Sequence, residues 1–307
     1  MVRCGIEDIE HRPGSWQQLH TRSARSSGGR GQTISDLEIK ASLAVAQGLG
    51  LVAESARPIS TSGRTVLLLE PRSVVANVEV FTELPRYARE VELSKHVQHR
   101  RGPVVAALLR ADPGPHVRDN WVISFWEYTP SEVTADALET SAAPAYAELR
   151  YRLNDFSGYL PYYLEPIEAC REALTRSQLK RPQPGFHLVR QALEAAVSLE
   201  VPASDLFVLH GDPHGRNLTA SSGEVLWLDL KSACLGPLEW DLTALPPEGH
   251  FAPPNHDRFA RLLSVRSACV VVWCLEKPRP QLHDLEAIQF HLQRLARTPV
   301  TSDGGWV

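Results

Sequence analysis

The first third of the chain alternates short apolar runs with polar turns, a pattern typical of β-strands. Three such runs lie at 66–69, 74–80 and 121–128. Between the second and third runs, Pro85 opens a stretch with helical spacing that continues to about Val97, since proline fits the first turn of a helix. An earlier helix is expected from the capping pair Ser35 and Glu38 to the glycine at position 48. This part of the chain therefore predicts a small sheet with accompanying helices.

After Pro130 the pattern changes to long Ala-, Leu- and Glu-rich stretches with the spacing of helices. They cover about 142–153, 166–175, 186–197, 256–275 and 283–297, and a polar loop between two apolar runs interrupts them at 206–230. We therefore expect a strand-rich first lobe at 34–128 and a mainly helical second lobe at 129–307. Residues 1–33 are rich in Ser, Gly and Arg and are predicted to be a disordered tail, because they carry little apolar surface to offset the entropy of ordering.

Composition and charge exclude several classes of protein. The 307 residues are 43% hydrophobic and 22% charged, as in ordinary globular proteins. A net charge of -4 supplies no basic surplus for a phosphate backbone, so nucleic acid is not an expected partner. The longest apolar run, Ala268 to Leu275, is far shorter than the roughly 20 residues that span a bilayer, and the first residues lack the apolar run of a secretory peptide. With five cysteines and no C-x-x-C pair, the sequence predicts a cytoplasmic protein without a membrane span.

The candidate catalytic residues lie in the segment 206–230, which interrupts the predicted helices. Its apolar runs bracket the turn residues 221–223, which predicts a hairpin. Asn217 and Asp229 lie symmetrically about Gly223, so antiparallel pairing would bring their backbones within about 5 to 7 Å of each other. An amide oxygen and a carboxylate are ligands that suit Mg²⁺. Asp212 lies on the loop before the hairpin and would accept a hydroxyl proton, so these three side chains fit a phosphoryl-transfer site.

The same segment contains a motif followed by a spaced aspartate. It reads His210-Gly-Asp-Pro-His-Gly-Arg-Asn217, and Asp229 and then Gly236-Pro-Leu-Glu-Trp-Asp-Leu242 follow. In this order the residues resemble the aminoglycoside phosphotransferase family. The resemblance implies an α+β, bilobal protein-kinase-like fold with a small antiparallel β-sheet N-lobe and a larger, mainly helical C-lobe. It also implies that Asp212 is the catalytic base, that Asn217 and Asp229 bind Mg²⁺, and that Asp241 braces the loop. From its place in the loop we expect His210 to support it through hydrogen bonds.

The resemblance extends loosely over residues 35–300 and places ATP, with GTP as the alternative, between the lobes. The connector against the adenine would consist of Phe125, Trp126, Glu127 and Tyr128. Glu90 falls where the family's helix glutamate pairs with a cation of the preceding strand, together forming part of the nucleotide site. The matching strand position carries Asn77, which has no charge. We expect weaker nucleotide binding or turnover unless Arg64 or Arg72 supplies that charge.

The acceptor is expected to be a hydroxyl group of a small molecule. By the family layout, Glu248, Asp257 and the helix from Arg266 to Trp273 would line its pocket. A polycationic aminoglycoside would need several carboxylates there, and we count only two, those of Glu248 and Asp257. Another antibiotic or a metabolite alcohol therefore fits equally well.

Three alternatives stay open from the sequence. The neutral Asn77 favours a pseudokinase, which binds nucleotide with little or no turnover. His210, Asp212 and His214 could instead hold a transition metal in a hydrolase, although a hydrolase would need neither Asn217 nor the segment at 236–242. Finally, the polar residues of the loop could be ordinary turn residues that bind the loop's own backbone and have no chemical role.

Overall fold

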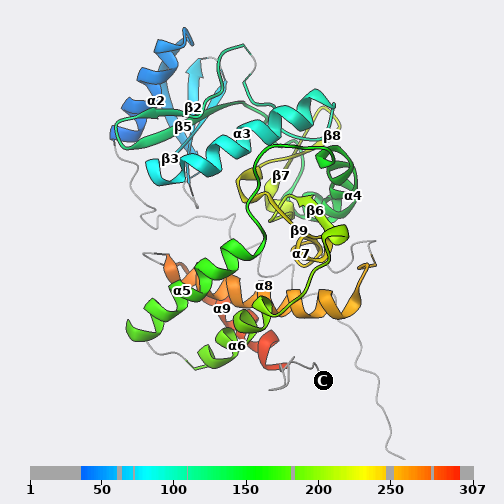
Figure 1. The fold of residues 1–307 in the computed structure, drawn as a ribbon. Coiled ribbons are helices and arrows are strands. Elements are labelled where there is room, and N and C mark those ends of the chain that lie inside the picture. Colours follow the sequence, from blue (N-terminus) through cyan, green and yellow to red (C-terminus); the bar gives the residue numbers. More distant parts are fainter. Residues whose placement is uncertain are drawn as a thin grey trace, which may run out of the picture.

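The computed structural model describes residues 36–60, 64–71, 73–108, 110–180, 184–246, 252–277 and 280–297. Within these ranges, five strands form an antiparallel sheet in the order β1-β2-β3-β5-β4 (Figure 1). The strands are β1 (Ala53–Ser60), β2 (Thr65–Pro71), β3 (Val74–Val80), β4 (His116–Arg118) and β5 (Trp121–Glu127). Neither β1 nor β4 was predicted from the sequence. Both lie at sheet edges, and β1 is exposed along most of its length, so neither shows a strong apolar pattern.

The two faces of this sheet carry different helices. On one face, Leu67, Ala76 and Phe125 belong to an apolar cluster completed by the helix α2 (Asp36–Gly48). On the other face, Trp126 packs with Val91 of α3 (Leu84–His99). Alternation along a strand produces this division, because successive side chains point to opposite faces.

The second part of the chain is mainly helical, and most of its helices lie below the sheet in Figure 1. Its longer helices are α4 (Ala135–Leu153), α5 (Leu164–Lys180), α6 (Phe186–Val197), α8 (His256–Glu276) and α9 (Leu282–Arg297). Short elements lie between α6 and α8: β6 (Leu206–Leu209), the 3-10 turn η4 (Gly215–Asn217), β7 (Leu218–Ser221), β8 (Glu224–Trp227), the 3-10 turn η5 (Leu230–Ser232), β9 (Cys234–Pro237) and α7 (Leu238–Leu242). Two further short 3-10 turns in the described ranges are η2 (Phe81–Glu83) and η3 (Ala203–Asp205).

Two apolar cores hold this part together. One joins α5, α6, α8 and α9 through residues such as Ile167, Leu193 and Val272. The other packs α4 against the β7–β8 hairpin, with Tyr146 and Trp227 fully buried. The hairpin therefore stands on a rigid base, which is what a site built on its end requires.

The predicted order of a small antiparallel sheet followed by a larger helical part is confirmed. One helix starts earlier than expected: α4 begins at Ala135 rather than near 142, because the Thr134 hydroxyl accepts a hydrogen bond from the backbone N–H of Ala137 and caps it. None of the helices in the described ranges is both long and apolar enough to cross a membrane. The predicted tail at 1–33 lies outside the described residues.

Candidate active site

The loop between β6 and η4 carries the predicted base, Asp212. The chain turns at Gly211, whose φ of +88° is one that glycine adopts readily. A Cβ atom at this position would collide with the carbonyl oxygen of Ser232, so a larger residue would force the loop and η5 apart. β6 pairs with β9 in antiparallel register from Leu206 to Leu209, which anchors the start of the loop. Asp212 therefore leaves a fixed strand through a turn that has little freedom.

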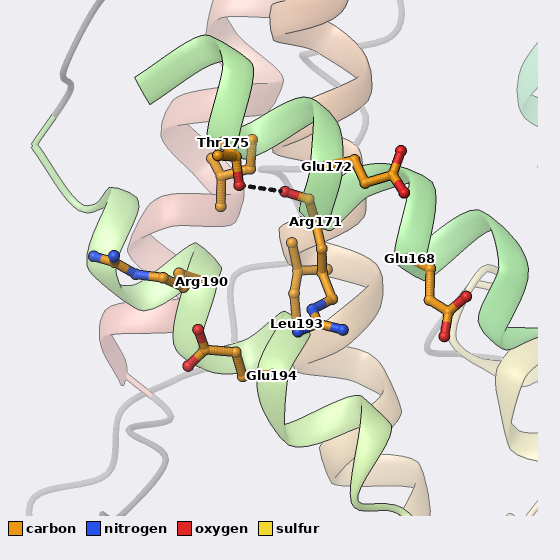
Figure 2. A pocket seen from close by; sticks show the side chains of 8 residues that line it. Glu168, Arg171, Glu172, Thr175, Arg190, Leu193 and Glu194 are labelled. Carbon is orange, nitrogen blue, oxygen red and sulfur yellow. Dashed lines mark hydrogen bonds between the residues drawn. The ribbon is translucent and has the colours of Figure 1, made fainter. Parts of the chain in front are cut away.

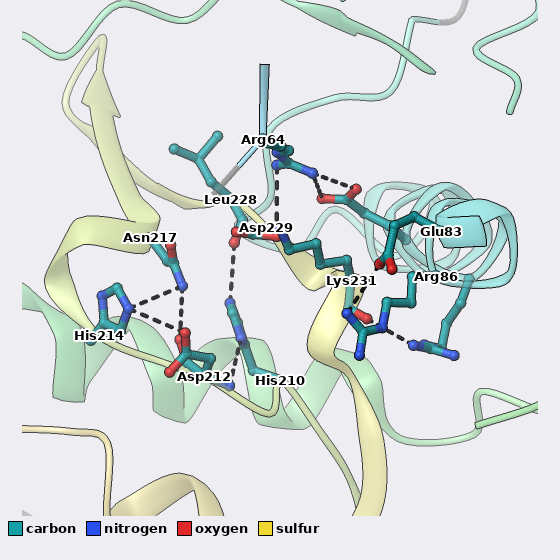
Figure 3. Close-up of polar contacts among 12 residues, drawn as sticks. Arg64, Glu83, Arg86, His210, Asp212, His214, Asn217, Leu228, Asp229 and Lys231 are labelled. Carbon is teal, nitrogen blue, oxygen red and sulfur yellow. Dashed lines mark hydrogen bonds and ion pairs between the residues drawn. The ribbon is translucent and has the colours of Figure 1, made fainter. Parts of the chain in front are cut away.

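The Asp212 carboxylate lies between the imidazole of His214 and the guanidinium of Arg266. His214 Nε2 is 3.3 Å from Asp212 Oδ2, and Arg266 Nη1 is 4.0 Å from Oδ1 (Figure 3 shows the histidine). Burial by itself would raise the pKa of Asp212, but His214 and Arg266 outweigh it and hold that pKa well below its ordinary value. The side chain remains 37% exposed. Asp212 is thus a carboxylate at neutral pH that a substrate can reach.

His210 supports the loop from a fully buried position. Its Nδ1 accepts a hydrogen bond from the backbone N–H of Asp212 (3.3 Å), and its Nε2 lies 3.2 Å from the carbonyl oxygen of Leu228. This pattern requires the proton on Nε2, and burial lowers the pKa of His210 to about 4, so the ring is neutral. Both ring nitrogens are therefore occupied, and neither is left for the transition metal of the hydrolase alternative.

Asp241 binds the backbone of the same loop. Its fully buried carboxylate accepts hydrogen bonds from the backbone N–H groups of His210 (2.8 Å) and Gly211 (2.9 Å). The hydroxyl of Tyr146 donates a third at 2.7 Å. Burial raises the pKa of Asp241 to about 6, against the opposing effect of these donors. α7 and α4 thereby hold the turn that precedes Asp212.

Replacing Asp241 by asparagine is expected to destabilise the protein by about 1 to 3 kcal/mol, because an amide cannot accept from all three donors. The folded-state pKa of about 6 exceeds the ordinary 3.8. Protonation of Asp241 therefore adds its full contribution to the free energy of unfolding below pH 3.8, and this contribution is lost as the pH rises through about 6. The difference between parent and variant should be larger near pH 4.5 than near pH 7.

Urea unfolding at both pH values measures this difference. Asp136→Asn, an exposed change at the start of α4, is the control. Equal stability of Asp241→Asn and the parent at both pH values would contradict the assigned role.

The hairpin brings Asn217 and Asp229 to the same end, with a register that differs by one residue from the prediction. Leu218 pairs with Trp227, so the turn consists of Ser222 and Gly223, both with positive φ. The backbone N–H of Leu228 donates to the carbonyl oxygen of Asn217 at 2.8 Å, and Asp229 follows one residue later. The predicted symmetry about Gly223 was wrong because a two-residue turn is centred between its two residues.

Both side chains have acceptor oxygens available for a cation. Asn217 Nδ2 donates to the carbonyl oxygen of Asp212 at 2.9 Å, which leaves the amide oxygen as its metal-binding group. Asp229 has a left-handed backbone (φ 62°), and its Oδ1 is buried without a hydrogen-bond partner. Among the described residues no group of three or more His, Cys, Asp or Glu side chains could hold a metal. One carboxylate and one amide nevertheless suit Mg²⁺, which keeps waters and takes phosphate oxygens as its other ligands.

Glu90 of α3 pairs with Arg64, the residue directly before β2. Arg64 Nη1 lies 3.1 Å from Glu90 Oε1 and 2.8 Å from Oε2. Asn77 occupies the adjoining position on β3, and with its amide oxygen turned toward Arg64 it accepts a hydrogen bond from Nη2 at 3.3 Å. Of the two arginines that could supply this charge, Arg64 therefore reaches the glutamate, while Arg72 lies outside the described residues.

The predicted connector residues do not share one face. Phe125 is fully buried in the cluster beneath α2, so its side chain points away from Glu90 and cannot line a nucleotide site there. This prediction was wrong because strand alternation places Phe125 opposite its neighbour. Trp126 lies on the α3 face, is 7% exposed and pairs in register with Val75. Glu127 and Tyr128 are half-buried at the end of the sheet.

Two acceptor residues, Glu248 and Asp257, were predicted from the family layout. Glu248 lies outside the described residues, and Asp257 is exposed in the first turn of α8. Arg266 is not a pocket wall. It is buried, stacks on Trp240 at 3.6 Å from the ring centroid, and donates to the carbonyl oxygen of Gly211 at 3.0 Å. An arginine just before the apolar run of α8 is a signal for such a role, because a buried charge needs partners.

Two surface hollows lie away from this loop. One, of about 360 Å³, lies between α5 and α6. Figure 2 shows charged side chains around it, and its lining is Glu168, Arg171, Glu172, Leu174, Thr175, Arg190, Leu193 and Glu194. The other, of about 350 Å³, is lined by Arg100, Tyr151, Asn154, Asp155, Leu206, Phe207, Val208 and Leu235. Neither includes Asp212, Asn217 or Asp229, so the chemistry-bearing loop and these hollows are separate features.

Comparison by sequence links the chain to one family. The model of a phosphotransferase enzyme family matches residues 55–261, a range that includes Arg64, Glu90, the loop and Asp241. No curated protein matches the chain.

Comparison by structure finds enzymes of the same fold. Choline kinase LicA from Streptococcus pneumoniae is 17% identical, with a TM-score of 0.61 over 86% of this chain and 100% of that one. A thermostable mutant of aminoglycoside phosphotransferase APH(4)-Ia is 13% identical, with a TM-score of 0.60 over 83% and 97%. Amicoumacin kinase hAmiN, solved with AMP-PNP, Ca²⁺ and Ami, is 10% identical, with a TM-score of 0.58 over 85% and 95%. The predicted bilobal, protein-kinase-like fold is thereby confirmed.

Proposed function

Because this chain belongs to the phosphotransferase enzyme family, we propose that it transfers the terminal phosphoryl group of a nucleoside triphosphate, ATP before GTP, to a hydroxyl group of a small molecule. The observation that carries the proposal is the ionised, partly exposed Asp212 on a braced loop, next to the end of the hairpin that bears Asn217 and Asp229. A carboxylate beside a metal-bound phosphate is the arrangement that phosphoryl transfer requires.

Asp212 would orient the acceptor hydroxyl and take its proton as the oxygen attacks the terminal phosphorus. Its bracing by His210, Asp241 and Arg266 keeps the carboxylate in place, so that little reorganisation is needed during the reaction. Asn217 and Asp229 would hold Mg²⁺, which when bound neutralises charge on the phosphates.

The acceptor is proposed only as an alcohol. The structurally similar enzymes include a choline kinase and an amicoumacin kinase, whose substrates differ widely. With Glu248 outside the described residues and Asp257 exposed, nothing favours a polycationic acceptor over an antibiotic or metabolite with fewer charges.

A thermal-shift series with MgATP and MgGTP, followed by a panel of antibiotic and metabolite alcohols, tests the proposal. Nucleotide at 100 times its dissociation constant stabilises the folded state by about 2.7 kcal/mol and should raise the melting temperature by several degrees. Phosphorylation of an acceptor supports the enzyme. Binding without transfer to any acceptor would favour the pseudokinase, and absence of both would contradict the proposal.

A further inference from the structure

Arg64 lies deep between the sheet and α3. Its side chain is 11% exposed, and its partner Glu90 is 2% exposed. Burial by itself would lower the pKa of Arg64, but the carboxylates of Glu90 and Asp229 outweigh it and raise the pKa above its ordinary value. A buried guanidinium that is paired on one side can still offer N–H groups on another, because its five donors point outward in a planar fork.

A second cation, Lys231, approaches the same place from η5. Arg64 Nη2 lies 3.7 Å from Asp229 Oδ1, and Lys231 Nζ lies 3.9 Å from Asp229 Oδ2 (Figure 3). Both distances exceed the hydrogen-bonding range. Each of the two cations thus lies near one oxygen of the Asp229 carboxylate without forming a hydrogen bond to it. Donors arranged in this way can bind further oxygens next to any cation that Asp229 holds.

Asn77 explains why the positive charge comes from the neighbouring strand. With the amide of Asn77 turned so that its oxygen faces Arg64, that oxygen accepts from Arg64 Nη2 at 3.3 Å and from Trp126 Nε1 at 3.1 Å. A lysine at this position would place a second positive charge directly against the guanidinium. Asn77 instead holds Arg64 in place.

We propose that Arg64 and Lys231 form a two-cation clamp for the phosphates of the nucleotide, with Arg64, directly before β2, supplying the charge that position 77 lacks. The proposal rests on the proposed function, since it concerns the nucleotide of that reaction. Guanidinium and ammonium groups beside a metal-binding carboxylate fit a polyphosphate, because they bind its oxygens through charge-assisted hydrogen bonds.

Calorimetric titration of MgADP and of adenosine tests the clamp. Arg64→Met is combined with Glu90→Gln, so that no buried carboxylate is left unpaired, and Lys231→Met is made separately. Each variant is expected to bind MgADP about 10- to 100-fold more weakly and adenosine as the parent does, because charge-assisted hydrogen bonds to phosphate are lost. Arg57→Met, which changes a 54% exposed arginine of β1, is the matched control and should bind both ligands normally.

A charge-relocation variant separates charge from packing. Asn77→Lys in the Arg64→Met background, with Glu90 retained, should recover most of the MgADP affinity. Failure of this rescue would overturn the claim that Arg64 acts through its charge.

The remaining outcomes are equally decisive. Unchanged MgADP binding in both clamp variants, or an equal loss of adenosine binding, would overturn the clamp while leaving the proposed function intact. A parent protein that binds neither MgADP nor adenosine would overturn both.

Discussion

Replacing Asp212 by asparagine is expected to lower the turnover number by about 10²- to 10⁴-fold and to leave nucleotide affinity nearly unchanged. The amide keeps the size of the side chain but cannot take the proton of the acceptor hydroxyl. Its neighbours His214 and Arg266 hold the parent residue as a carboxylate, so the change removes a charge that is present at neutral pH.

Steady-state kinetics with a phosphorylated acceptor, together with nucleotide titration, measure this effect. Asp155→Asn, at an 80% exposed carboxylate that pairs with Arg100, is the control. Our assignment of the base predicts a loss in kcat rather than in binding. Parent-like turnover of Asp212→Asn would show that another group accepts the proton.

Replacing Asp229 by asparagine should abolish the dependence of nucleotide binding on Mg²⁺ and lower kcat/KM by about 10²- to 10³-fold, since a metal ion contributes several kcal/mol of charge stabilisation. Asparagine tolerates the left-handed backbone at this position, so the hairpin end should keep its shape. The buried Oδ1, which has no hydrogen-bond partner, is the atom whose loss of charge matters.

Titration of ATP in the presence of Mg²⁺ and of a chelator separates this effect from general damage. The parent should bind more tightly with the metal. The variant should bind equally in both conditions, with repulsion relieved between the phosphates and the former carboxylate. If Asp229→Asn kept the full response to Mg²⁺, the metal ligand would have to be sought elsewhere.

The overall architecture and much of the candidate loop could be predicted because their signals are local. The apolar runs of β2, β3 and β5 and the helical spacing after Pro130 mark elements that bury apolar surface wherever they pack. The loop residues His210, Asp212 and Asn217 lie within eight consecutive positions, so any fold that forms the turn brings them together. The edge strands β1 and β4 could not be predicted, because an exposed strand does not need the alternation of apolar and polar residues that marks a half-buried one.

The distribution of charge around the loop was decided by the tertiary structure. Arg64, Glu90 and Asp229 come from three separate segments, and no spacing in the sequence relates them. Arg266 is distant in sequence from Asp212 yet supports its loop, and Phe125 faces the opposite side of the sheet from Trp126. The sequence by itself determined which residues could perform the chemistry. Packing decided which of them meet, because a buried charge is stable only where the fold brings its partner within a few ångströms.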